Sequence, residues 1–550
     1  MQNLKDEFIY REETRMKADL ILRNARIFTV DSARPWAEAV ACAAGRIVAV
    51  GSDDELTDLA GPNTQFINAG GRLVLPGLTD AHVHFLWNVI RLRHSQVDLY
   101  GVSDFDEVRR RLRQAVEIAG PGQWVHGWGW DESLWDVQPA LALLDDISPH
   151  TPVALRRVDL HTWWVNSAAL KLAGVTPETP DLPGSRLGRD ITGELTGVLH
   201  EWAVIRLVEQ HIPEPDAATL QDWLQDAIAE AHRLGLTGIH DQRVQREGSQ
   251  TLRLFHALRR RGELNLRIHL NIAAEYLTEA ATLGVQAGFG DDRLWIGHVK
   301  AFADGTMGAR TALMLEPFEG EPNNRGIPVT SAENLWELAV QANQAGFPLS
   351  VHAIGDRAVQ DVVDVLSEFP PDDSSLTFSL PHRIEHVQVI HPDDLPRLSQ
   401  HGIVASVQPV HLLSDWRTAD RVWGRRARYA YAFRSLLDYK TQMAFGSDAP
   451  FAPLNPMLGI YAAVTRQDQR GEPKTGWYVE ERLSVAETIH GYTMGPAYAA
   501  GKQHVQGSIT PGKWADMIIL DRDIFAIEPM EIAQTQVVMT VFDGRVVYAR

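Results

Sequence analysis

Short apolar runs alternate with amphipathic stretches through the middle of this 550-residue chain. Eight of the runs have the length and β-rich composition of strands, and segments of helical periodicity, such as 333–346 and 356–369, separate most of them. Alternating strands and helices favour a parallel sheet, and eight such strands predict an α/β fold with a closed (β/α)8 TIM barrel. The candidate strands are LVLPGLTDAHVHF (73–85), TGIHD (237–241), LRIHLNI (266–272), LWIGHVKAFADG (294–305), FPLSVHAIGD (347–356), PHRIEHVQVI (381–390), GIVASVQPV (402–410) and MAFGSDAP (443–450).

The two ends of the chain share a different pattern. Residues 18–75 and 505–550 both contain short β-rich runs separated by glycine turns, including Asp543-Gly544 as a hairpin signal. Two β-rich ends that flank a long middle predict one small β domain assembled from both, which leaves 76–504 for the barrel domain. Residues 1–17 fit neither pattern, and we interpret them as an N-terminal extension.

One connection is much longer than a barrel crossover needs. About 150 residues separate the first candidate strand from the second, so the sequence predicts an α/β insertion over 86–232, inside the barrel domain. Six tryptophans lie between Trp124 and Trp164. These indoles either build the core of the insertion or line an apolar substrate pocket, and the sequence leaves both readings open.

Residues that can bind a metal ion lie at the ends of the candidate strands. His82 and His84 are two positions apart, so in a strand both side chains face the same way. Because the C-terminal strand ends of a (β/α)8 barrel meet at one mouth, residues far apart in sequence can share one site there. The set at these ends is His82, His84, Lys300, His352, His386 and Asp448.

The residue types suit hydrolysis at a metal centre. Neutral imidazoles bind Zn²⁺, and a bound divalent metal lowers the pKa of water from about 16 to about 7. Asp448 can both ligate the metal and take a proton from that water. A lysine ammonium cannot ligate, whereas a lysine carbamate can bridge two ions, so Lys300 is a candidate N6-carboxylysine.

Each candidate also has a plain structural explanation when it is taken alone. His352 or His386 could be a core histidine, and Asp448 could cap a helix. Lys300 could pair with an acid, although it sits in an apolar strand where a lone ammonium is costly to bury. Their joint occurrence at successive strand ends favours a site for one or two divalent ions. Zinc is expected, and Fe, Mn and Ni accept the same ligands.

Five motifs occur in a fixed order: PGLTDAHVH, HVKAFADGTMGARTA, SVHAIGDRAV, RIEHV and FGSDAPFAPLNP. Together they resemble the amidohydrolase superfamily. The insertion segments GWGWDESLW and RRVDLHTWWVNSAALKLAGV are similar to its amidohydrolase-3 branch, which includes N-substituted formamide deformylase. The resemblance covers nearly the whole chain beyond residue 17. It departs at Met307, where the family usually has a small residue.

This resemblance implies a distorted TIM barrel, a composite β-sandwich built from 18–75 plus 505–550, and a mononuclear or binuclear site. It also implies that the six strand-end residues are the metal ligands, with Asp448 as the catalytic proton shuttle. The implied activity is metal-dependent hydrolysis of a C–N bond of amide type, such as an N-formyl or N-acyl bond, by metal-activated water.

Other functions remain open on the same metal centre. The nucleophile would also attack an ester, lactone or carbamate. Deamination is disfavoured, because such enzymes usually carry a Glu shortly after the fifth-strand histidine, and here Ala353 to Asp356 follow His352. A non-catalytic barrel regulator would be expected to lose ligands, whereas all six positions here hold competent residues.

Substrate contacts are harder to assign from the sequence. Trp128 and His161 in the insertion, and Arg310 and Arg383 in the barrel, are candidates for contacts to a small-molecule substrate. For each of them a structural hydrogen bond or salt bridge is an equally good explanation.

The amino-acid composition limits the kinds of binding partner and the cellular location that we expect. The chain has 52 Lys and Arg against 71 Asp and Glu, a net charge of −19, so nothing favours nucleic acid or an anionic membrane. A single cysteine excludes an intrachain disulfide, and the charged N-terminus lacks an apolar signal segment. No apolar stretch is long enough to span a membrane. We therefore expect a cytoplasmic protein, and a homodimer as the commonest oligomer.

Overall fold

The computed structural model describes residues 17–550 except 95, 121, 159–160, 183–184, 214, 243–247 and 371–379. The extension predicted at 1–17 therefore lies outside the described residues, apart from Lys17. The chain forms two compact units. One contains the chain up to Val83, Ile228–Asp448 and Ala452–Arg550, and the other contains His84–Ala227 with Ala449–Phe451.

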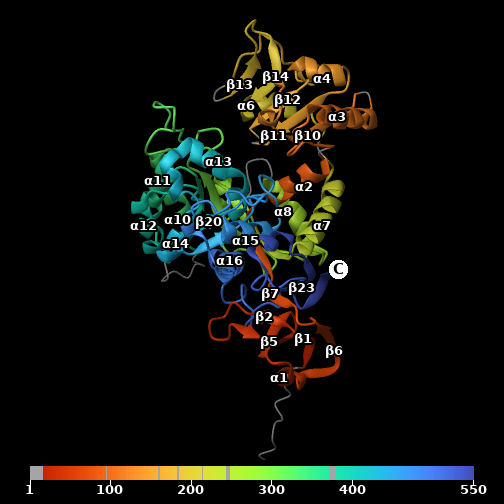
Figure 1. Cartoon of the computed structure of the whole chain (residues 1–550), viewed down its shortest axis with the longest axis vertical. Coiled ribbons are helices and arrows are strands. Elements are labelled where there is room, and N and C mark those ends of the chain that lie inside the picture. Colours follow the sequence, from red (N-terminus) through yellow and green to blue (C-terminus); the bar gives the residue numbers. More distant parts are fainter. Residues whose placement is uncertain are drawn as a thin grey trace, which may run out of the picture. The chain divides into compact units, whose positions relative to one another are not determined.

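The first unit contains the barrel (Figure 1). All eight candidate strands are present and pair in parallel, which confirms the predicted TIM-barrel fold. The amide of Asp448, after the last strand, donates to the carbonyl of His82 in the first strand (2.7 Å), so the sheet nearly closes on itself. In sheet order, the strands are β21 (Met443–Phe445), β20 (Val404–Val407), β19 (Arg383–His386), β18 (Leu349–Ala353), β17 (Leu294–Phe302), β16 (Arg267–Ala273), β15 (Leu236–Asp241) and β8 (Leu78–Val83).

Helices connect and follow these strands, as the alternating pattern predicts. The segment 356–369 shows the cause: its helix, α11 (Asp356–Leu366), buries Ala358, Val359, Val362 and Val363 on one face. The helices of this part are α7 (Ala217–Arg233), α8 (Gly248–Arg260), α9 (Leu277–Thr282), α10 (Ala332–Gln344), α11 (Asp356–Leu366), α12 (Leu395–Gln400), α13 (Leu412–Trp423), α14 (Phe433–Asp438), α15 (Pro456–Thr465), α16 (Val485–Tyr492) and α17 (Met494–Ala499).

Two further sheets use strands from the ends of the chain. A four-stranded sheet has the order β5 (Arg46–Gly51), β4 (Ala39–Ala43), β1 (Ala18–Arg23), β6 (Ala60–Asn68), with α1 (Asp53–Thr57) between β5 and β6 in sequence. A six-stranded sheet has the order β24 (Arg545–Ala549), β23 (Val537–Phe542), β22 (Met517–Leu520), β7 (Leu73–Pro76), β2 (Arg26–Phe28), β3 (Trp36–Ala37).

These two sheets share one buried core. Leu20 and Ile47 from the start of the chain pack in the same apolar cluster as Met517 and Val541 from its end. β22 pairs antiparallel with β7, which joins the two ends directly. The predicted β domain assembled from both termini is therefore present.

The second unit has its own mixed sheet, in the order β13 (Arg186–Arg189), β14 (Leu195–His200), β12 (Thr162–Val165), β11 (Val153–Arg157), β10 (Val125–Trp130), β9 (Val97–Asp98). Its helices are α2 (Phe85–His94), α3 (Phe105–Ala119), α4 (Leu141–Ile147), α5 (Ser167–Leu172) and α6 (Trp202–Glu209). The predicted insertion, 86–232, overlaps this unit. Trp130, Trp135 and Trp164 lie in one of its apolar clusters, and Trp124 and Trp163 lie in another, so these five indoles build cores.

Among the residues that the structure describes, every helix is too short or too polar to traverse a lipid bilayer.

Candidate metal centre

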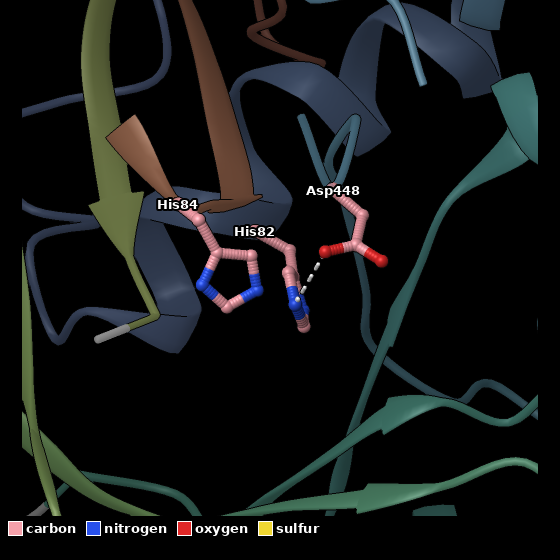
Figure 2. Close-up of side chains that lie close together, drawn as sticks. All are labelled: His82, His84 and Asp448. Atoms are coloured by element: carbon pink, nitrogen blue, oxygen red, sulfur yellow. Dashed lines mark ion pairs between the residues drawn. The ribbon is translucent and has the colours of Figure 1, made fainter. Parts of the chain in front are cut away.

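Three of the predicted ligands form a compact cluster (Figure 2). One ligand atom from each of His82, His84 and Asp448 lies within 4.8 Å of the others, and all three residues are buried. His82 belongs to β8, His84 follows the end of that strand, and Asp448 follows β21, the last strand of the barrel. The strand-end positions thus bring together residues that are more than 360 positions apart.

Two more imidazoles extend the cluster. The ring of His386, the last residue of β19, lies 4.8 Å from the His82 ring and 4.5 Å from the His352 ring, centroid to centroid. His386 and Asp448 both adopt positive φ, at 78° and 58°. Such left-handed backbone costs a non-glycine residue on the order of 1–3 kcal/mol and is concentrated at functional sites.

Three of the predicted imidazole ligands each have one ring nitrogen within hydrogen-bond distance of a protein oxygen. Nδ1 of His82 lies 2.6 Å from Glu385 Oε2, and Nδ1 of His386 lies 2.7 Å from Gln408 Oε1. Nε2 of His352 lies 3.0 Å from the Gly305 carbonyl oxygen. Because these nitrogens donate, a neutral ring carries its lone pair on the opposite nitrogen: Nε2 of His82 and His386, and Nδ1 of His352.

Electrostatics keep two of these rings neutral. Burial, with the nearby charge of Lys300, lowers the pKa of His352 to about 3. Burial and the neighbouring His352 ring hold the pKa of His386 well below its usual range. For His82, burial lowers the pKa, but the carboxylates of Asp448 and Glu385 together outweigh burial, so the pKa is raised. A neutral imidazole is the form that binds metal.

Lys300 on β17 is the fourth strand-end position. Its side chain is 2% exposed, and its Nζ has no hydrogen-bond partner among the described residues. The Nζ lies 5.0 Å from the centroid of the Phe302 ring, and burial lowers its pKa to about 8. A buried amine with no hydrogen-bond acceptor fits a residue that is completed by a bound group. The donor set as a whole therefore fits a divalent cation.

Sequence reasoning missed a fifth imidazole. His411 ends a 3-10 turn, η4 (Pro409–His411), that follows barrel strand β20 closely. Its Nε2 lies 3.8 Å from Asp448 Oδ2, and its ring stacks at 6.5 Å from that of His386. The sequence did contain one indication of this residue. His411 comes in the segment QPVH directly after the seventh barrel strand, and the C-terminal strand ends meet at one mouth of the barrel.

The four predicted substrate contacts have diverse surroundings. Trp128 stacks on Tyr100 at 5.4 Å, and His161 Nδ1 lies 2.9 Å from Glu201 Oε2, all within the second unit. Arg310 forms an ion pair with Glu321. Arg383 is 0% exposed, and its partners among the described residues are all barrel atoms, so it lies in the core instead of at a surface that a ligand could reach.

The barrel, its strand-end histidines and the buried carboxylate together define a metal-dependent hydrolase of the TIM-barrel class. A profile of the amidohydrolase family matches residues 65–548, and the chain belongs to that family. The resemblance seen in its motifs is thereby confirmed.

Known proteins resemble the chain over nearly its whole length. The protein LONG AFTER FAR-RED 3 of Arabidopsis thaliana is 34% identical over 92% of this chain and 87% of its own length. The N-substituted formamide deformylase of Arthrobacter pascens is 28% identical over 97% of this chain and 98% of its own. A solved structure of an uncharacterized metal-dependent hydrolase from Pyrococcus furiosus superposes with a TM-score of 0.74 at 28% identity, covering 92% and 99%.

Proposed function

We propose that the protein hydrolyses a small molecule at an amide-type C–N bond, such as an N-formyl or N-acyl amine, with one or two divalent cations. The supporting observation is the buried cluster of His82, His84 and Asp448 at the ends of β8 and β21. The formamide deformylase relative supports the bond type.

The cation would be held by His82, His84, His352, His386 and Asp448, and by Lys300 in its carbamate form. A divalent cation bound by such a set supplies a Lewis acid that polarises a carbonyl and makes water acidic enough to react near neutral pH. The chain's own residues do the rest. His82 and His386 present Nε2, His352 presents Nδ1, and the buried Asp448 carboxylate accepts a proton and passes it to the leaving nitrogen.

A deaminase is less well supported. The residue at the position where a ring-protonating acid would be sought after His352 is Asp356, and its Oδ1 accepts the amide N–H of Leu315 (2.8 Å). This carboxylate holds a loop, so it is committed to structure. A non-catalytic regulator is disfavoured because each predicted ligand position keeps a residue able to bind.

The test is a substrate panel with purified, metal-loaded protein. N-formyl and N-acyl amines are compared with esters and lactones of matched size, and kcat/KM is measured for each. For each compound, kcat/KM is divided by its rate constant for uncatalysed hydrolysis. We expect this ratio to be larger for the amide-type compounds than for the matched esters. A metal-loaded sample that turns over esters alone would contradict the assigned bond type.

Three finer assignments stay predictions. Zinc as the cation is tested by elemental analysis, carboxylation of Lys300 by native mass spectrometry, and the homodimer by sedimentation.

A further inference from the structure

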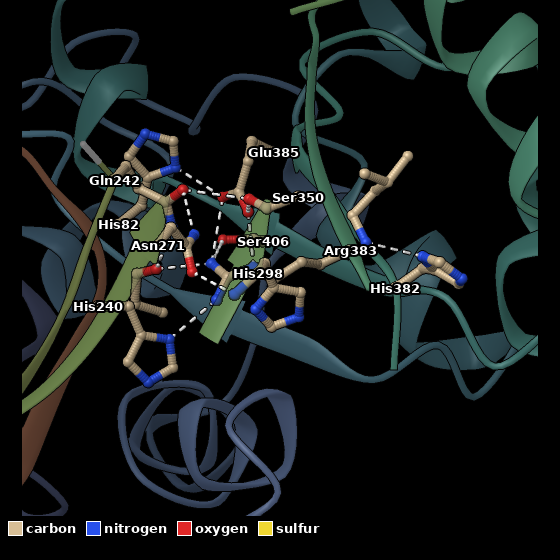
Figure 3. Close-up of polar contacts among 12 residues, drawn as sticks. His82, His240, Gln242, Asn271, His298, Ser350, His382, Arg383, Glu385 and Ser406 are labelled. Carbon is tan, nitrogen blue, oxygen red and sulfur yellow. Dashed lines mark hydrogen bonds and ion pairs between the residues drawn. The ribbon is translucent and has the colours of Figure 1, made fainter. Parts of the chain in front are cut away.

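A buried polar cluster contacts Nδ1 of His82, the ring nitrogen opposite the one that lies near Asp448 (Figure 3). Its centre is Glu385 on β19, which is 0% exposed. We call Glu385, Arg383, Ser350 and His82 the Glu385 cluster. An ionised carboxylate is costly to bury unless its oxygens accept hydrogen bonds and a positive charge lies close by.

Both carboxylate oxygens of Glu385 are satisfied. Oε1 accepts from Arg383 Nε and from Ser350 Oγ, each at 2.6 Å. Oε2 accepts from Arg383 Nη2 at 3.2 Å and lies 2.6 Å from Nδ1 of His82. Three of these contacts hold the carboxylate in place, and the fourth holds the imidazole ring.

Arg383 is itself fixed. Its guanidinium also donates to the carbonyl of Ala81 (2.6 Å), to Ser406 Oγ (2.6 Å) and to Nδ1 of His240 (2.9 Å). Arg383 lies on β19, and these partners lie on β8, β20 and β15. Its guanidinium therefore forms hydrogen bonds that connect four barrel strands. The carboxylate that faces His82 therefore has little freedom to move.

Strand geometry explains how the cluster forms. Residues 383 and 385 are two apart on β19, so their side chains point to the same side of the sheet. The parallel pairing sets Ser350 of β18 directly beside Arg383. The barrel interior places His82 of β8, which is 1% exposed, against the same carboxylate.

We propose that Glu385 is a positioning residue that fixes the tautomer and orientation of His82, so that Nε2 is presented to the cation. The inference rests on the proposed metal centre. The opposite nitrogen already faces the site, because Nε2 of His82 lies 3.3 Å from Asp448 Oδ1. Carboxylates behind metal-binding histidines act in this way, and their loss typically costs about 10–100-fold in metal affinity or activity.

The ring would be poorly defined without the carboxylate. An imidazole can rotate about its Cβ–Cγ bond and exchange its two nitrogens, and either tautomer is available to a neutral ring. The hydrogen bond to Glu385 selects one of these arrangements. Removal of that acceptor should therefore weaken cation binding and change ligand geometry without removing any ligand.

The experiment compares Glu385→Gln and Glu385→Asp with wild type. Glutamine keeps the size but loses the charge, whereas aspartate keeps the charge but withdraws the oxygens from Nδ1 by one methylene. The matched control is Glu481→Gln: Glu481 is equally a buried carboxylate, 6% exposed, and it accepts from the amide and hydroxyl of Ser435. Metal dissociation constants are measured by chelator competition, and the absorption spectrum of the cobalt-substituted protein reports ligand geometry.

Both Glu385 variants should bind the cation about 10–100-fold more weakly than wild type and show an altered cobalt spectrum. Glu481→Gln should keep the wild-type affinity and spectrum, even if its stability falls. Wild-type affinity and spectrum in either folded Glu385 variant would overturn the proposal. A wild-type protein that binds no cation at all would overturn the metal centre itself, which separates the two failures.

Discussion

The substitution Asp448→Asn tests the proposed proton shuttle most sharply. The carboxylate is buried at 6% exposure, 3.3 Å from Nε2 of His82 and 3.8 Å from Nε2 of His411. Asparagine has nearly the same shape, and the amide N–H of this residue still donates to the His82 carbonyl, so the strand junction should survive. The amide side chain cannot accept a proton at neutral pH.

The expected fall in kcat follows from the loss of proton transfer by residue 448. General acid–base catalysis by a positioned side chain contributes about 10²–10⁴-fold, so kcat should fall by that factor, or by about 3–5 kcal/mol of transition-state stabilisation. Loss of a charged ligand adds to this through lower metal occupancy, which is measured on the same sample and used to correct kcat.

The control is Asp394→Asn. Asp394 is a buried carboxylate, 1% exposed, that pairs with Arg397. This variant should lose stability and keep its turnover. A fully metallated Asp448→Asn protein with a kcat close to that of wild type would refute the assignment of Asp448 as the shuttle.

Two further predictions concern Lys300 and His382. Lys300→Ala should lose metal affinity and activity, and acetate, which offers a carboxylate in the vacated space, should restore part of both; an activity that acetate leaves unchanged would favour a plain buried amine. Burial lowers the pKa of His382 to about 4, below its ordinary 6.5, so the folded state stays neutral while the unfolded chain takes up a proton as pH falls. His382 therefore contributes stability above pH 6.5 that is lost toward pH 4, about 2 kcal/mol of it by pH 5. In urea unfolding at pH 7 and pH 5, His382→Asn should show a smaller difference than wild type, and an equal difference would contradict this cause.

Much of the barrel could be predicted from the sequence because parallel strands are buried on both faces and read as continuous apolar runs. The β17 run, LWIGHVKAF, is an example: eight of its nine residues are buried. The composite β domain was also predictable, since its alternating strands occur at both chain ends. The α/β character of the insertion was predicted, but the strand order of its sheet was not, because short connections, such as the one from β11 to β12, alternate with long ones that contain helices.

The site was predictable only in part. Strand-end positions and motifs pointed to His82, His84 and Asp448, because a barrel brings such ends together. His411 lay just beyond the predicted strand and had no motif of its own. The partner of each imidazole nitrogen, such as Glu385 for His82, depends on which side chains meet across strands, and no spacing within one strand encodes that.

Arg383 illustrates the same limit. The sequence left both a substrate contact and a structural salt bridge open for Arg383, and its guanidinium here donates to Glu385, Ser406 and the Ala81 carbonyl. The barrel interior uses its charge to hold a carboxylate. A sequence pattern alone cannot separate these two uses of one side chain.

The central claim is that the clustered side chains hold a cation on which turnover depends. The direct measurement is titration of metal into chelator-stripped protein, with bound metal per chain and kcat followed together on a substrate found in the panel. We expect the stripped protein to be inactive, and activity to rise in proportion to occupancy until one or two ions are bound per chain. Full turnover by a verified metal-free sample would contradict the account.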